Sequence, residues 1–154
     1  MSLTSDQLKL QLGVAERRCA ARGVQLTSLR RLALELLLET DRPLKAYTLL
    51  EAIAGRGRRS TPATIYRTLD FLIELGLAHK VASINAFVAC TDTDETHQPL
   101  LLVCPDCLKA TEINDHALSA ALFGRLDALG HSVGPGAVEV RGQCRDCADK
   151  ASEL

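Results

Sequence analysis

The chain has 154 residues and a formal net charge of -1 at pH 7, and 47% of its residues are hydrophobic, enough to bury the core of one domain or two small ones. No apolar run approaches the ~20 residues of a membrane span, and the first residues lack the basic start and apolar stretch of a secretory signal, which excludes the membrane-spanning and secreted classes. The six cysteines are therefore expected to be thiols of a cytoplasmic protein rather than three disulfides.

The small net charge hides an uneven distribution along the chain. Residues 1–84 hold 13 Lys and Arg against 8 Asp and Glu, whereas residues 85–154 hold 5 against 11. The first part therefore suits an anionic partner, and the second part carries most of the candidate metal ligands. Charge alone leaves open a chance imbalance between two solvated surfaces, so the motifs must decide.

Successive helices are predicted at the start of the chain. Apolar residues at helical spacing indicate a first helix over about residues 5–22, with Cys19 as a small buried residue. Thr27 can cap a second helix, which is broken by the segment from Asp41 to Pro43. A short third helix is expected over about residues 46–54.

The fourth predicted helix begins at Pro62, because Thr61 can cap its free amides and proline at the first helical position loses no hydrogen bond. Its apolar residues fall on one side, whereas Arg67 points nearly opposite, and the small neighbours of Arg67 permit close approach to a surface. This pattern favours a recognition helix for the major groove of DNA, with arginine available to guanine edges. The candidate DNA contacts on and before this helix are Arg58, Arg59, Thr64, Tyr66 and Arg67.

A small hairpin and a polar segment follow. Residues 77–82 and 85–90 indicate two short strands, and helices followed by such a hairpin predict a winged helix-turn-helix domain over residues 1–90. Residues 91–96 are polar and lack apolar periodicity, as expected of a hinge. Beyond it the pattern predicts a small α/β unit, so the expected fold class is α+β. Its strands are expected over 100–103, 110–113 and 137–141, and its helix from Asp115 to about Leu129.

A pair of Cys-x-x-Cys motifs, separated by 36 residues, is the strongest motif in the chain. Four thiolates in two tight pairs can surround one metal ion tetrahedrally, and zinc is the usual occupant of such a set. Because four thiolates leave zinc no open coordination position, the predicted role is structural. Redox chemistry is the alternative, although one Cys-x-x-Cys pair would suffice for it. The ligands are Cys104, Cys107, Cys144 and Cys147.

A second candidate ligand set lies between the two parts of the chain and consists of His79, Cys90, His97 and Glu112. Each has an ordinary alternative as a surface histidine, a buried cysteine or a solvated carboxylate. Together, one thiolate, two imidazoles and one carboxylate form a suitable tetrahedral zinc set, and the soft thiolate disfavours iron(II) and manganese. The remaining histidines, His116 and His131, are interpreted as surface residues.

Several segments together resemble the ferric uptake regulator family, and within it the zinc uptake regulator branch. They are Leu26-Thr-Ser-Leu-Arg30, Thr64-Ile-Tyr-Arg-Thr-Leu69, Gly76-Leu-Ala-His-Lys80 and the paired Cys-x-x-Cys motif. The resemblance covers nearly the whole chain. It implies a homodimer in which residues 1–90 form the winged-helix DNA-binding domain and residues 97–154 form an α/β dimerisation domain with a structural zinc.

The resemblance also implies what the sites do. The second ligand set matches the regulatory zinc of this branch, which gives two zinc ions per chain. Tyr66 and Arg67 match recognition-helix contacts, and Tyr47 matches a position near the phosphate backbone. The implied function is zinc-responsive repression of zinc-uptake and zinc-homeostasis genes. Zinc would act as co-repressor by ordering the hinge and setting the spacing of two recognition helices on a pseudo-palindromic operator.

Three alternatives remain open at this point. The first is a regulator of the same family that responds to iron, manganese or peroxide, although the chain lacks the His-rich stretch of iron-sensing relatives before its first Cys-x-x-Cys pair. The second is a zinc enzyme such as a nucleobase deaminase, but its His-x-Glu and Pro-Cys-x-x-Cys motifs do not occur, so no enzyme is expected. The third is a structural zinc module for protein partners, which would leave the exposed Arg67 without a purpose.

Overall fold

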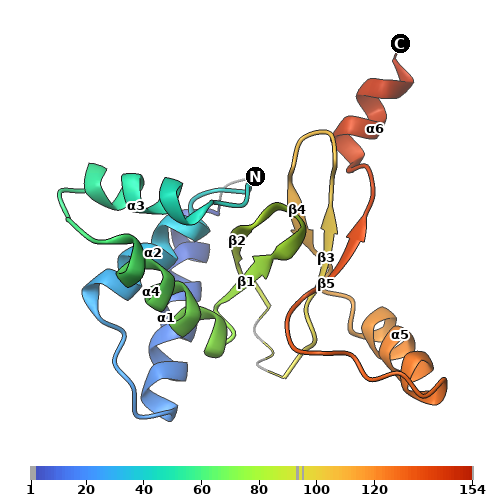
Figure 1. The fold of residues 1–154 in the computed structure, drawn as a ribbon, viewed down its shortest axis with the longest axis horizontal. Coiled ribbons are helices and arrows are strands. Elements are labelled where there is room, and N and C mark those ends of the chain that lie inside the picture. The colour runs from blue at the N-terminus through green and yellow to red at the C-terminus, as the bar shows by residue number, and fades with distance from the viewer. Residues whose placement is uncertain (1–2, 93, 95, 154) are drawn as a thin grey trace.

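The computed structural model describes residues 3–92, 94 and 96–153. Helices α1 to α4 form one body on the left of Figure 1, and their bounds match the predicted ones closely. Threonine side chains at positions 4, 27 and 61 cap α1, α2 and α4 by accepting a hydrogen bond from the backbone amide three residues on. The helices are α1 (Ser5–Ala21), α2 (Ser28–Leu38), α3 (Ala46–Gly55) and α4 (Pro62–Glu74).

One hydrophobic core joins these helices. Ile65, Leu69 and Leu72 of α4 are fully buried and pack with leucines of α2 and α3 in the same cluster. Cys19 of α1 is buried in this core as predicted. Arg67 lies on the opposite side of α4 and is exposed, so the helix presents a polar face to solvent.

The predicted hairpin is confirmed as strands β1 (Ala78–Val81) and β2 (Ala86–Ala89), which pair antiparallel. The turn η1 (Ala82–Ile84) and Asn85 connect them, and Asn85 adopts a φ of 48°, a left-handed conformation that asparagine tolerates. A bridge between Leu44 and Phe87 attaches the hairpin to the helices. The first part of the chain is therefore a winged helix-turn-helix.

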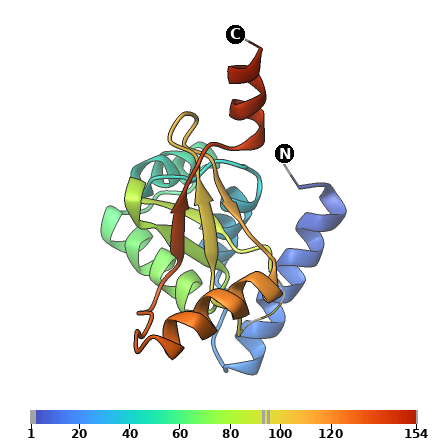
Figure 2. The same cartoon turned by 90° about the vertical axis from the view of Figure 1, so that its right-hand side faces the viewer.

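The second part of the chain forms a sheet in the order β4-β3-β5, with β3 antiparallel to β4 and parallel to β5. Helix α5 begins after its predicted cap, Asp115, and α6 extends away from the rest of the chain (Figures 1 and 2). Helix α6 was not predicted. The elements are β3 (Leu100–Val103), β4 (Ala110–Glu112), α5 (His116–Ala128), β5 (Val138–Arg141) and α6 (Arg145–Ser152). Within the described residues, no helix is long and apolar enough to span a membrane.

The hairpin lies between the helices and the second sheet and contacts both (Figure 1). Val81 of β1 forms a buried apolar cluster with Leu101 and Val103 of β3, which we call the seam. Beside the seam, the backbone amide of Ser83 donates to the carboxylate of Glu139 in β5, at 3.2 and 3.3 Å. The two parts of the molecule therefore share an apolar and polar contact next to the candidate ligands.

Candidate metal centres and DNA-binding surface

The four-cysteine site (Cys104, Cys107, Cys144, Cys147) is assembled by the parallel pairing of β3 and β5. The carboxyl ends of these strands lie side by side, with Val103 opposite Arg141, and a Cys-x-x-Cys pair follows each strand. The Cys107 and Cys144 sulfurs are 3.8 Å apart, and all four sulfurs lie within 4.8 Å of one another. Tetrahedral zinc with bonds of about 2.3 Å to sulfur holds its ligands roughly 3.8 Å apart. The set therefore fits zinc.

The groups around this site position the thiols and shift the pKa values of two of them in opposite directions. Cys144 is the N-terminal cap of α6, which places Cys147 in the first turn of a helix, where the dipole favours a thiolate. Backbone hydrogen bonds from Cys144 and Cys107 lower the pKa of Cys104 to about 6. The thiol hydrogen bond with Cys144 raises the pKa of Cys147 to about 12. These two thiols thus differ in how readily they lose a proton.

The hinge site (His79, Cys90, His97, Glu112) collects one ligand from each of four segments. His79 lies on β1, and Cys90 follows β2, where its amide donates to the carbonyl of Leu77 at 2.9 Å. Glu112 ends β4 and pairs with Leu101 of β3, close to the point where His97 precedes that strand. The wing therefore supplies two of the ligands and the second sheet supplies the other two.

The ligand atoms of the hinge site converge on one point. Glu112 Oε1 lies 2.8 Å from His97 Nε2 and 3.1 Å from His79 Nε2, and Cys90 Sγ lies 3.6 Å from Glu112 Oε1 and 3.7 Å from His97 Nε2. A tetrahedral zinc ion separates such ligand atoms by roughly 3.3–3.8 Å. The two contacts to cysteine match this range, and the shorter His–Glu contacts are hydrogen bonds that a metal would replace.

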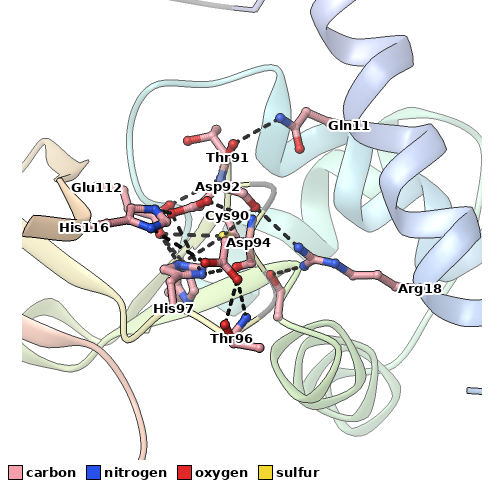
Figure 3. A network of polar contacts seen from close by, with 12 residues as sticks. Gln11, Arg18, Cys90, Thr91, Asp92, Asp94, Thr96, His97, Glu112 and His116 are labelled. Carbon is pink, nitrogen blue, oxygen red and sulfur yellow. Dashed lines mark hydrogen bonds and ion pairs between the residues drawn. The ribbon is translucent and has the colours of Figure 1, made fainter. Parts of the chain in front are cut away.

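Neighbouring backbone groups fix the orientation of these ligands (Figure 3). The amide of Thr91 donates to Glu112 Oε2 at 3.3 Å, which leaves Oε1 for the centre of the site. Nδ1 of His97 contacts the carbonyl oxygen of Asp94. Because a carbonyl only accepts, Nδ1 must carry the proton and Nε2 faces the metal position.

The site without metal holds protons that zinc must displace. Burial, together with the charge of Glu112, raises the pKa of Cys90 to about 12. Burial acts to lower the pKa of His97, but its hydrogen bonds to the Asp94 carbonyl and to Glu112 outweigh burial, so the pKa is raised. Burial alone would raise the pKa of Glu112, whereas its hydrogen bonds to His79 and His97 lower it. Zinc binding therefore releases a proton from Cys90 and competes with protonation of His97.

The polar segment predicted to be a hinge contributes buried contacts. Thr93 and Glu95 of that segment lie outside the described residues, but Asp92 is only 9% exposed. Asp92 Oδ2 lies 3.0 Å from Nε2 of His116, so this histidine is paired although its side chain is 56% exposed. Among the described residues, no further group of three or more His, Cys, Asp or Glu ligand atoms lies as close together as those of the two sites.

Sequence reasoning missed one residue next to the hinge site. Arg18 of α1 is only 6% exposed, and its guanidinium reaches the backbone on both sides of the wing. A signal was available, because Arg18 follows buried Val14 by four residues and buried Ala15 by three, which places it on the buried stripe of α1.

The predicted DNA contacts lie on the surface of α3, α4 and the loop between them. Arg58, Arg59 and Arg67 are exposed, and Tyr47 and Tyr66 line the same shallow pocket. Thr64 is half-buried, and its hydroxyl accepts from Arg67 Nη2 at 3.4 Å. Arg58 Nη1 donates to the hydroxyl of Ser28 at the start of α2, at 2.7 Å. The cationic and aromatic side chains thus remain available to a partner.

Comparison with known proteins gives matches over nearly the whole chain. The model of the ferric uptake regulator family matches residues 21–131. The zinc uptake regulation protein of Escherichia coli K12 is 35% identical over 146 residues, which cover 90% of this chain and 81% of that protein.

Solved structures extend the likeness to three dimensions. A zinc uptake regulator complexed with zinc and DNA superposes with a TM-score of 0.81 at 30% identity, covering 97% of this chain and 99% of that one. The holo form of XcZur gives a TM-score of 0.75 at 37% identity, covering 92% of this chain and 99% of that one. Its apo form gives 0.53 at 36% identity, with coverage of 93% and 99%.

Proposed function

The chain belongs to the ferric uptake regulator family, and from that membership we propose that it is a zinc-responsive DNA-binding repressor of zinc-uptake and zinc-homeostasis genes. The observation that carries the proposal is the hinge site, where a thiolate, two imidazoles and a carboxylate from both parts of the chain lie within 4.8 Å of one another. A ligand set with a soft thiolate favours zinc over iron(II) or manganese. Its relatives are zinc uptake regulators, which supports the same choice.

Zinc would act as co-repressor by selecting one arrangement of the two parts. Its ligands come from the wing and from the second sheet, so the ion can bind all four only when these lie together. The population shift toward the compact arrangement is set by how much more tightly zinc binds the compact arrangement than the open one. The higher TM-score with holo than with apo XcZur, at nearly equal identity, supports assigning the arrangement described here to the zinc-bound state.

The domain division follows from this mechanism. Residues 1–90 would form the DNA-binding domain, residues 91–96 the hinge and residues 97–154 the zinc-binding dimerisation domain. We place one zinc in the four-cysteine site to hold the second sheet together and another in the hinge site, which makes two per chain. The function is regulatory rather than enzymatic, and the cytoplasm, where the DNA lies, is the expected location.

A homodimer is part of the proposal. No residue of α5, all of which is described, is buried, and Leu118 and Leu129 at this helix are 47% and 59% exposed. Val140 on the edge strand β5 is 44% exposed. These apolar groups support a second copy of the chain as their partner. A twofold dimer presents two copies of α4, which suits a pseudo-palindromic operator.

The main experiment combines metal analysis with DNA binding. The full chain is exposed to graded concentrations of a zinc chelator, and its zinc content is measured beside its affinity for a duplex selected from random sequences by the zinc-loaded protein. We expect two zinc equivalents per chain, with only the weaker one controlling DNA affinity. Equal DNA binding with and without the weaker zinc, or activation by iron(II) or manganese but not by zinc, would contradict the proposal.

The DNA contacts are tested by separating specificity from affinity. Arg67→Ala should reduce discrimination between the selected duplex and single-base variants by about 1–3 kcal/mol, because it removes the proposed contact to a base edge. Arg58→Ala and Arg59→Ala should instead weaken binding to all sequences and lower the salt dependence by about one charge each. If the Arg67→Ala variant keeps full discrimination between the duplexes, α4 does not recognise the bases. Tyr47 and Tyr66 would then contact only the DNA backbone.

A further inference from the structure

A buried arginine joins the end of α4 to the backbone that leaves the hinge site. Arg18 Nη1 donates to the carbonyls of Leu75 at 3.3 Å and Gly76 at 2.9 Å. Its Nη2 donates to the carbonyl of Asp92 at 3.4 Å (Figure 3). Burying a guanidinium is unfavourable unless its N–H groups find acceptors. These carbonyls, which belong to two separate segments, therefore help to fix the position of Arg18.

At α4, Arg18 acts on a helix end that requires partners. The last carbonyls of a helix lack intrahelical donors, and a positive charge there is favourable to the helix dipole. Arg22 supplies the same chemistry from the exposed side, where Nη1 donates to the carbonyl of Glu74 at 3.0 Å. Gly76 has a φ of +67°, and a Cβ at this position would lie 3.2 Å from Arg18 Nη1. The close approach of the guanidinium thus depends on glycine.

At the hinge site, Arg18 shares its acceptor with a zinc ligand. The carbonyl of Asp92 also accepts the thiol of Cys90, with Sγ 3.7 Å away. When Cys90 binds zinc as a thiolate, it has no proton left to donate to the carbonyl of Asp92. Of the two hydrogen bonds to this carbonyl, only the one from Arg18 then remains. Gln11 of α1 donates to the neighbouring carbonyl of Thr91 at 3.3 Å, so α1 holds two consecutive carbonyls of this segment.

We propose that Arg18 is the positioning residue through which zinc at the hinge site fixes α4 relative to the second sheet. The planar guanidinium can hold acceptors in two directions at once, which a lysine ammonium on a flexible stem does less well. In an arrangement with the two parts separated, Arg18 would keep its carbonyls on α4 and lose that of Asp92. The hydrogen bond to Asp92 therefore adds to the preference of zinc for the compact arrangement.

This inference rests on the proposed zinc-dependent DNA binding, and its test measures coupling rather than affinity alone. DNA affinity is measured for the full chain with the hinge site loaded or stripped and the four-cysteine site loaded throughout, using the duplex selected by zinc-loaded protein. Arg18→Lys and Arg18→Met should reduce the zinc-dependent gain in DNA affinity by roughly tenfold, whereas any weakening of α4 itself should lower the affinity equally with and without hinge zinc.

The matched control is Arg30→Met, which removes a cation that lies over the ring of Phe71 in α4, 3.6 Å from its centre, and donates to the carbonyl of Gln25. It should shift DNA affinity equally with and without zinc and so preserve the gain. A wild-type gain in both Arg18 variants overturns the inference. An equal loss of gain in Arg30→Met also overturns it, since the loss of any cation that contacts α4 would then explain the effect. A wild-type chain whose DNA binding ignores zinc refutes the proposed function itself.

A measurement on the unaltered chain covers variants that fail to fold. The arginine side-chain N–H signals are followed by NMR while zinc is added to the hinge site of the full chain. We expect the Arg18 signals to shift and to become protected from exchange as Asp92 is fixed, while those of Arg30, which contacts Phe71 and the carbonyl of Gln25, stay unchanged. Identical Arg18 signals in the two states overturn the inference.

Discussion

The two candidate metal sites differ in where their ligands come from. The four-cysteine site takes all its ligands from segments that follow β3 and β5 of one sheet, whereas the hinge site takes two from the wing and two from the second sheet. Metal in the first site would therefore stabilise a single unit. Metal in the second site would change how two units are held relative to each other. Under the proposed mechanism, only a site with ligands from both units can transmit zinc binding to the DNA-binding surface.

The strongest way to test this difference is to remove the first site. Cys104→Ser should unfold the second sheet and abolish DNA binding at any zinc concentration, because metal sites of this kind contribute folding free energy on the order of 10 kcal/mol. Zinc content and thermal unfolding by circular dichroism measure the effect. The control is Cys19→Ala, a buried cysteine outside both sites, which should cost about 1 kcal/mol and keep both zinc ions. A folded Cys104→Ser chain with normal DNA binding would contradict the structural role.

Removing a ligand of the second site should leave the fold intact. The Cys90→Ser variant is expected to keep the zinc of the four-cysteine site and the melting temperature. Its hinge site should bind zinc at least about 100-fold more weakly, so that DNA binding no longer depends on the zinc concentration. Zinc competition with a chromogenic chelator and DNA-binding titrations check this. Unchanged zinc-dependent DNA binding in this variant would remove Cys90 from the mechanism.

Acid should act on the hinge site in the same direction as ligand removal. The raised pKa of Cys90, about 12, means that zinc displaces a proton from this thiol throughout the neutral range. Because the pKa of His97 is raised, zinc must also displace a proton from this imidazole once the pH falls below that pKa. Lowering the pH from 8 to 6 should thus weaken the affinity of the hinge site for zinc by about tenfold per pH unit for each proton displaced. Excess zinc at pH 6 should restore DNA binding, and a failure to do so would place the pH effect elsewhere.

The smallest expected effect comes from the seam. Val81→Ala should remove about 1–2 kcal/mol from the seam contact, which joins the two parts of the chain in the compact arrangement. The affinity of the hinge site for zinc should therefore fall by roughly fivefold to thirtyfold. Val14→Ala is the matched control, because Val14 is buried in the first part alone. It should lower the melting temperature without changing zinc affinity. Equal zinc affinities in the two variants would show that the seam does not contribute to the compact arrangement.

Sequence patterns predicted the helices and strands that bury an apolar face. They also predicted the candidate metal ligands, because the side chains of these residues are of uncommon chemical types. Helices α1 to α5 carry caps or apolar stripes, and the strands carry short apolar runs, so local residues were sufficient. Helix α6 was missed because Arg145–Ser152 is mostly polar and starts at a zinc-ligand turn. The thiols, imidazoles and the carboxylate were recognised by type, but only the strand pairing brings Glu112 next to His97.

The role of Arg18 could not be read from its neighbours in the sequence. An arginine is usually exposed, and even its place on the buried stripe of α1 does not say what it contacts. Its acceptors at Leu75 and Asp92 lie 57 and 74 residues away along the chain. Only the tertiary arrangement supplies them.

The parallel pairing of β3 with β5 also has a consequence for how the protein is made. Leu100 pairs with Val138 across 38 residues, whereas β1 pairs with β2 across a short turn next to helices whose contacts are local. Long-range pairing closes more slowly than local structure, and folding during synthesis starts at the N-terminus. A newly made chain is thus expected to complete its wing and α4 before the sheet that supplies Glu112 and the four cysteines.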